Sequence, residues 1–188
     1  MGVPTSTNDF KNGMTLELPD GLFSIVEFQH VKPGKGGAFV RTKLRNVRTK
    51  AVIDRTYRAD EKVDQAIIEK KDMQYLYRDG DNYVFMDNVS YDQITVDPVD
   101  LGNAANFIKE GDSASVSMHD ETVVGVELPA STTLTVEVTE PGIQGDRVSG
   151  ARKPATLETG YVLQVPLFIE QGEKIIVDTR TGDYISRA

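Results

Sequence analysis

The sequence predicts an all-β protein built of several small barrels, and three observations lead to this expectation. Apolar and polar residues alternate with a period of two through most of the chain, as they do in half-buried strands. Turn signals such as Asp79-Gly80-Asp81 and Thr181-Gly182 separate the alternating runs. The chain has 188 residues of which 39% are hydrophobic, a composition that favours several small cores.

The first third of the chain contains the longest predicted hairpin. Residues 22–31 and 38–47 both alternate, and the connection at 32–37 contains one proline and three glycines. Ten residues of strand span roughly 30 Å, so this arm is expected to leave a small domain. Within the second run, Val40 and its alternate neighbours are expected on one face and the basic residues on the other.

The rest of the chain repeats the β pattern and contains one predicted helix. Residues 101–108 favour a short helix because apolar residues recur there at i, i+3, i+4 and i+7. Residues 128–131 are expected to form a linker, and domain boundaries are predicted at 1–65, 66–129 and 130–188. Five-stranded barrels of the oligonucleotide-binding (OB) type suit the second and third domains. The remaining predicted strands are 73–78, 82–86, 113–118, 122–127, 134–139, 161–166, 174–178 and 183–186.

Charge is distributed unevenly along this acidic chain, whose net charge is −8. Residues 1–65 carry a net charge of +3, residues 66–129 carry −9, and residues 130–188 carry −2. Nine basic residues and a single acidic one lie between positions 30 and 58. A local basic patch of this kind is what binding to a phosphate backbone requires, whatever the overall charge.

Several classes of function are disfavoured by what the sequence lacks. The chain has no cysteine, so a disulfide framework, thiolate metal sites and a cysteine nucleophile are excluded, which is compatible with a reducing cytoplasm. No apolar run is long enough to span a membrane, and no secretory signal is recognised at the N-terminus. The two histidines, His30 and His119, lack metal or triad spacing, and no nucleophile elbow or phosphate-binding loop occurs. We therefore expect a cytoplasmic protein that is not an enzyme and has no metal or cofactor.

Three stretches, in the same order, resemble those of bacterial elongation factor P, and the similarity runs from about residue 8 to residue 187. The first is Asn8-Asp9-Phe10-Lys11-Asn12-Gly13, and the second is the lysine-tipped segment 31–45. The third and most specific is Lys-Pro-Ala-Thr-Leu-Glu-Thr-Gly at 153–160, continued at 165–172 and 177–180. The resemblance implies an N-terminal SH3-like (KOW-type) barrel carrying the hairpin, two OB-fold barrels and an L-shaped outline similar to that of tRNA.

The resemblance also implies a function in translation. A monomeric factor of this family binds both ribosomal subunits between the peptidyl-tRNA (P) site and the exit (E) site, and relieves stalling at consecutive prolines. Lys35 aligns with the functional tip lysine, which contacts phosphate and ribose oxygens at the CCA end of peptidyl-tRNA. A lysine-modifying enzyme extends this residue in many members, whereas others use it unmodified, and the sequence around Lys35 is compatible with both.

The residues around the tip are assigned supporting roles. Pro33 is expected to stiffen the loop, and Gly34, Gly36 and Gly37 are expected to let the backbone turn tightly and approach RNA closely. Basic side chains with a predicted role in RNA binding precede the tip or alternate onto one face of the following strand, where the alternative is a solvated strand face. They are Lys32, Arg41, Lys43 and Arg45.

The third domain supplies further candidates by alignment. Gly145 and Asp146 match the first two residues of a Gly-Asp-Thr loop that approaches the E-site mRNA codon, whereas Arg147 departs from it and puts any transferred codon preference in doubt. Tyr184 and Arg187 match positions implicated in contacts with peptidyl-tRNA and the small subunit. For Tyr184, packing on a barrel strand is an equally good interpretation.

Two other functions remain as alternatives, a divergent paralogue of the same family and a general OB-fold RNA-binding protein. The intact Pro33-Gly34-Lys35-Gly36 tip argues against the first. The second requires stacking aromatics interleaved with basic residues in the barrels, which are acidic here. Tyr75 and Tyr77 are disfavoured as a base-stacking platform, because the acidic residues around them would repel RNA.

Overall fold

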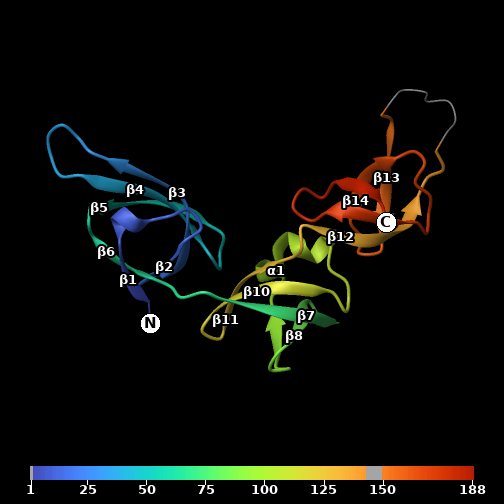
Figure 1. Ribbon diagram of the computed structural model, residues 1–188, viewed down its shortest axis with the longest axis horizontal. Helices are drawn as coiled ribbons and strands as arrows, with labels where there is room; N and C mark the ends of the chain where they lie inside the picture. Colours follow the sequence, from blue (N-terminus) through green and yellow to red (C-terminus); the bar gives the residue numbers. More distant parts are fainter. Residues whose placement is uncertain (1, 143–149) are drawn as a thin grey trace. The chain divides into compact units, whose positions relative to one another are not determined.

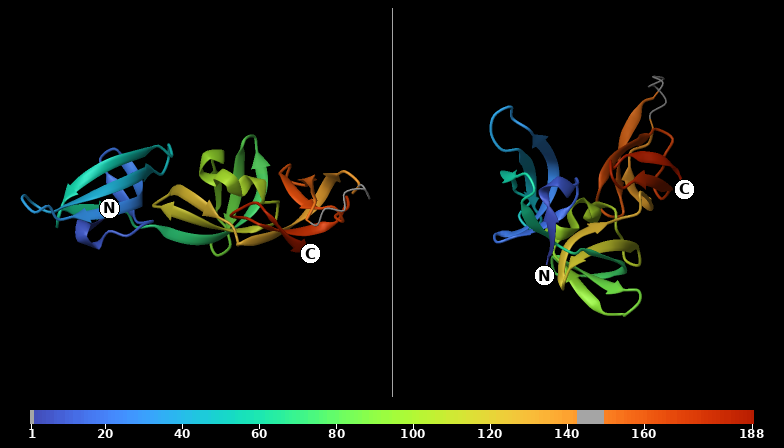
Figure 2. Two further views of the ribbon diagram at one scale, coloured as in Figure 1. Left: turned by 90° about the horizontal axis from the view of Figure 1, so that it is seen from above. Right: turned by 60° about the vertical axis from the view of Figure 1, so that its left-hand side comes forward.

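The structure is a computed structural model that describes residues 2–142 and 150–188. Within these ranges the strands form three sheets, which confirms the predicted all-β class (Figures 1 and 2). The chain divides into two compact units, one made of Met1–Lys70 with Ser117–Gly125 and the other of Lys71–Val116 with Val126–Ala188. Among the helices described, none is long and apolar enough to span a membrane.

The first sheet carries the predicted hairpin. The pairing of β3 with β4 is antiparallel and runs from Phe23–Asn46 to Val31–Phe39, with one irregularity between Ile25 and Glu27. The strands end within one residue of the predicted positions. In spatial order β1-β6-β2-β3-β4-β5, the strands are β1 (Val3–Ser6), β6 (Lys62–Gln65), β2 (Thr15–Leu18), β3 (Gly21–Val31), β4 (Phe39–Asn46) and β5 (Val52–Arg58), with a 3₁₀ turn, η1 (Thr7–Asp9), after β1.

The two faces of β4 differ as the alternation predicts. Val40, Thr42 and Leu44 are buried. The basic residues that alternate with them, Arg41, Lys43 and Arg45, are exposed. Thr42 can be buried because its hydroxyl donates a hydrogen bond of 2.7 Å to the carbonyl oxygen of Arg55 on β5. The buried face therefore closes the core of the barrel, while the exposed face is free to carry charge.

The second sheet contains a helical segment between two of its strands along the chain, and this segment begins earlier than predicted. Asp97 caps α1 (Pro98–Leu101) by accepting a hydrogen bond from the backbone of Val99. The α-helix ends at Gly102, where φ is +56°, and continues as the 3₁₀ helix η2 (Gly102–Asn106). In spatial order β11-β10-β7-β8-β9, the strands are β11 (Thr122–Glu127), β10 (Ser113–His119), β7 (Glu69–Asp79), β8 (Asn82–Asp87) and β9 (Gln93–Val96).

The third sheet is organised around its first strand, which pairs antiparallel with two others. Ser131 already pairs with Asp178, so the expected linker at 128–131 ends one residue earlier than predicted. The strand at 152–157 was not predicted, because Lys153 occupies a buried position on it and interrupts the apolar alternation. In spatial order, the strands are β14 (Val162–Pro166), β13 (Arg152–Leu157), β12 (Ser131–Thr139), β15 (Lys174–Asp178) and β16 (Tyr184–Arg187).

The segment after η2 joins the second and third sheets inside one compact unit. Phe107, which is 4% exposed, belongs to the apolar core of the third sheet, and its ring lies 4.9 Å from that of Tyr161. Burial of a phenyl ring in a core formed by other strands fixes the segment to that core.

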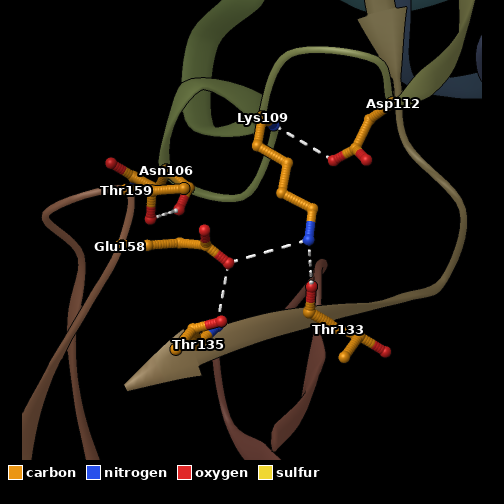
Figure 3. Close-up of polar contacts among 7 residues, drawn as sticks. All are labelled: Asn106, Lys109, Asp112, Thr133, Thr135, Glu158 and Thr159. Atoms are coloured by element: carbon orange, nitrogen blue, oxygen red, sulfur yellow. Dashed lines mark hydrogen bonds and ion pairs between the residues drawn. The ribbon is translucent and has the colours of Figure 1, made fainter. Parts of the chain in front are cut away.

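Polar contacts also link this segment to the third sheet (Figure 3). The Lys109 ammonium donates to the carbonyl oxygen of Thr133 at 3.1 Å and lies 3.6 Å from Glu158. The Glu158 carboxylate in turn accepts a hydrogen bond of 2.8 Å from the backbone of Thr135. The Thr159 hydroxyl donates to the carbonyl oxygen of Asn106 at 2.6 Å. These contacts satisfy the polar groups at the junction and orient the segment that carries Phe107.

Phe107→Ala is expected to lower the free energy of unfolding by about 3–5 kcal/mol, because it removes a buried ring and leaves a cavity. Chemical denaturation followed by circular dichroism measures the change. Val89→Ala is the matched control, since Val89 is 87% exposed and its truncation should change the stability by less than about 0.5 kcal/mol. Equal effects of the two substitutions would contradict the assigned role of Phe107.

Candidate nucleic-acid interface

The tip of the β3–β4 hairpin is fully exposed. Residues 32–38 connect the last strand pair, Val31–Phe39 (Figure 1). Residues 32–37 are all solvent-exposed. Neither the Lys32 nor the Lys35 ammonium has a hydrogen bond or ion pair with any part of the chain that the structure describes. Both cations are therefore available to an external anion.

One of the three tip glycines has a conformation that requires glycine. Gly36 has φ +110°, a region that residues with a side chain rarely adopt, and a Cβ at this position would lie 3.9 Å from the Pro33 ring. Gly34 and Gly37 have no positive φ, and a Cβ at either would meet no atom within 4 Å. The backbone turn that presents Lys35 thus depends on Gly36, while the other two glycines leave open space around the tip.

The basic side chains on β4 have different surroundings. The Lys43 ammonium lies 3.7 Å from Glu27 on β3. The Arg41 guanidinium lies 5.4 Å from the centroid of the Phe39 ring, a cation–π arrangement. Arg45 is exposed and has no ion pair among the described residues. The predicted basic face is present, but its members are not equally available to phosphate.

Arg187, the predicted basic site residue near the C-terminus, is held by intramolecular contacts. Arg187 donates to the carbonyl oxygen of Phe168 at 3.0 Å, lies 3.1 Å from Glu173 and stacks over the Phe168 ring at 4.7 Å. Tyr184 is partly buried and packs against the core of the third sheet. Tyr184 and Arg187 thus lie on one strand, β16, and both side chains contact other parts of the third sheet and its loops.

The structure does not describe three sequence-predicted site residues, Gly145, Asp146 and Arg147, which lie outside the described ranges. Tyr75 and Tyr77, the pair disfavoured as a stacking platform, differ in burial. Tyr75 is 5% exposed and packs against Tyr83 and Phe85, whereas Tyr77 is 47% exposed.

The exposed face around Arg41 contains polar residues that the sequence analysis did not select. An open groove of about 430 Å³ lies over β3, β4 and β5. Strand pairing places Gln29 and Thr56 on either side of Arg41, and both line the groove. The register of β4 with β5 was the missing information, because β5 was not predicted as a strand. In the described ranges, no three His, Asp or Glu side chains gather as they would around a metal ion.

The all-β fold of this chain has a counterpart among solved structures, and three family descriptions cover most of its length. The solved structure of eukaryotic translation initiation factor 5A from Methanococcus jannaschii has the same type of fold, with a TM-score of 0.55 and 20% identity, over 66% of this chain and 96% of that one. Three family descriptions match successive parts of this chain. They are the elongation factor P KOW-like domain at residues 6–63, the elongation factor P OB domain at 68–126, and the elongation factor P C-terminal domain at 132–187.

Full-length relatives give the family directly. The chain is 56% identical to elongation factor P of Kocuria rhizophila over 97% of both chains. It is 58% identical to that of Acidothermus cellulolyticus over 97% of this chain and 98% of the other. It is 59% identical to that of Streptomyces avermitilis over 97% of both. The chain belongs to the elongation factor P family, and it is a translation elongation factor that works with the ribosome.

Gly36→Ala is expected to change the conformation of residues 32–37, because a side chain at φ +110° costs about 1–3 kcal/mol of local strain. Stability should change by less than about 0.5 kcal/mol, since the exposed loop can rearrange without breaking strand pairs. Backbone amide chemical shifts of the loop measure the change. Gly34→Ala adds the same methyl group where the backbone accepts it, and should leave these shifts almost unaltered beyond its neighbours.

Proposed function

We propose that this elongation factor binds the ribosome between the P and E sites and stimulates peptide-bond formation, relieving stalling at consecutive prolines. The observation that carries the proposal is the exposure of Lys35 at the end of a long paired hairpin, with no partner for its ammonium among the described residues. Such a side chain can enter a site formed by RNA and donate up to three hydrogen bonds there.

The contribution to the reaction is positional. Proline is a poor substrate in peptide transfer, and a polyproline chain tends to draw the ester of peptidyl-tRNA out of alignment. Lys35 holds phosphate and ribose oxygens at the CCA end, which keeps the reacting atoms in place and lowers the entropic part of the barrier. The ribosome performs the bond chemistry, so this chain acts as a positioning factor without enzymatic activity or a cofactor of its own.

The rest of the molecule supports this placement. Domains at 1–65, 66–129 and 130–188 act as a monomer in the cytoplasm and contact both ribosomal subunits. Arg41 and Arg45 on β4, together with Lys32, follow the acceptor arm of the P-site tRNA, mainly through sequence-independent phosphate contacts. Near the C-terminus, Tyr184 and Arg187 lie toward the small-subunit side. Residues 145–147 approach the E-site codon, and Lys35 is the target of any modifying enzyme that the host supplies.

Lys35→Ala is expected to leave folding unchanged and to reduce polyproline-dependent stimulation by at least about tenfold, equivalent to roughly 1.4 kcal/mol of barrier. A reconstituted translation system making a peptide with consecutive prolines measures the rate. Lys62→Ala is the matched control, since it removes the same charge from an exposed strand position of the same barrel. Equal rates for wild type and Lys35→Ala would refute the proposed mechanism.

The chemical state of Lys35 can be measured by mass. The intact mass of the protein from its native host, followed by fragmentation across residues 31–41, shows whether a group is attached to Lys35. An unmodified residue that still relieves stalling would mean that the lysine alone is long enough for its role.

A further inference from the structure

The exposed face of β3, β4 and β5 consists of cross-strand rows, because residues opposite one another in neighbouring strands point the same way. Two successive rows on this face have different chemistry, although each has one basic residue of β4 at its centre. One row is Glu27–Lys43–Asp54, and the other is Gln29–Arg41–Thr56.

The Lys43 row is electrostatically compensated. Lys43 lies between two carboxylates in the strand register and is 3.7 Å from that of Glu27. A phosphate that approached Lys43 would also approach Glu27 and Asp54, and like charges at short range repel it. With two acidic residues and one basic residue, the net charge of the row is −1, so we do not expect it to bind a polyanion.

The Arg41 row has the opposite character. Arg41 is flanked by an amide and a hydroxyl, both exposed and neither charged. Within the described residues Arg41 has no ion pair, and its guanidinium contacts the Phe39 ring, which leaves its N–H groups free. No acidic residue occurs at positions 28–42 or 55–58, so the strands carry no carboxylate of their own between this row and the loop. Beyond them, the Glu61 carboxylate accepts a hydrogen bond from the backbone of Arg58.

We propose that Gln29, Arg41 and Thr56 form a binding site for one nucleotide unit of an RNA backbone. The Arg41 guanidinium donates two parallel hydrogen bonds to a phosphate, a geometry for which arginine is suited. The Thr56 hydroxyl donates to the same phosphate from one side, and the Gln29 amide bonds the adjoining ribose 2′-hydroxyl from the other. The open groove of about 430 Å³ over these strands provides the space, and because the Lys43 row lines it as well, the phosphate is expected at its Arg41 side.

This site deepens the proposed function and depends on it for the identity of the RNA, which is the P-site tRNA. It also divides the roles on β4. Arg41 binds phosphate, whereas Lys43 offsets the charge of one of the two carboxylates beside it. The charge therefore increases from the Lys43 row toward the tip, which favours placement of the RNA backbone near Lys35.

The test compares variants that change charge in different rows. Arg41→Gln should raise the concentration of factor that gives half-maximal polyproline stimulation by about tenfold, and should reduce the slope of log affinity against log salt by about one. The double variant E27Q/K43Q removes one charge of each sign from the neighbouring row and should change that concentration by less than about twofold. The maximal rate at saturating factor should be unchanged in all of these variants.

Two substitutions of uncharged residues test whether RNA binding depends on specific hydrogen bonds in this row or only on the positive charge of the surface. Thr56→Val and Gln29→Ala alter no charge, yet each should raise the half-maximal concentration by about threefold or more while the salt slope stays the same. Thermal unfolding confirms that each variant is folded. The site is refuted if both neutral variants bind like wild type, or if E27Q/K43Q loses as much affinity as Arg41→Gln.

A direct binding assay tests the nucleotide site independently of the proposed role in relieving stalling. Fluorescently labelled deacylated tRNA is the probe, and its dissociation constant is measured for the same variants. If Lys35→Ala leaves stalling relief intact while the row variants weaken tRNA binding in the expected order, the proposed mechanism fails and the nucleotide site stands. If tRNA binding by all row variants equals that of wild type, the site fails whatever the outcome of the stalling assay.

Discussion

The antiparallel pairing of β3 with β4 is the constraint on which the exposed lysine depends. The pairing continues as far as Val31–Phe39, and β5 pairs with β4 as far as Phe39–Arg58, so the arm is supported by a third strand almost to its end. The loop at 32–38 begins where this strand pairing ends. The buried face of β4 anchors the arm in the barrel core, which means that the same alternation both closes the core and presents the cations.

The net charge of the whole chain does not describe the charge of its parts. The net charge of −8 belongs mostly to the middle of the chain, and the hairpin contains a separate basic surface. Within that surface the carboxylates beside Lys43 cancel part of the field, and the rows nearer the tip have none. Long-range repulsion from the acidic parts and short-range attraction near Lys35 together favour one mode of approach for an RNA partner.

Sequence patterns predicted the long hairpin, most strands of the last two sheets and the exposure of the tip, because these elements alternate cleanly and are bounded by turn residues. They failed where a tertiary contact overrides the local pattern. The strand containing Lys153 was missed because a lysine occupies a core position, where its ammonium donates to the carbonyl oxygen of Glu140. Strands β1, β2, β5, β6 and β9 were not assigned, and without β5 the neighbours of Arg41 could not be identified. Local periodicity carries no information on which strands pair.

The position of Phe107 has a consequence for how the chain can be divided. Its ring comes from the segment that follows the second sheet but completes the core of the third. A fragment that ended before β12 would expose the Phe107 ring to water. A third sheet produced without residue 107 would have a cavity in its core at the position of that ring. The last two sheets therefore cannot be exchanged between relatives as independent modules unless the donor supplies residues 98–109 together with the strands that enclose them.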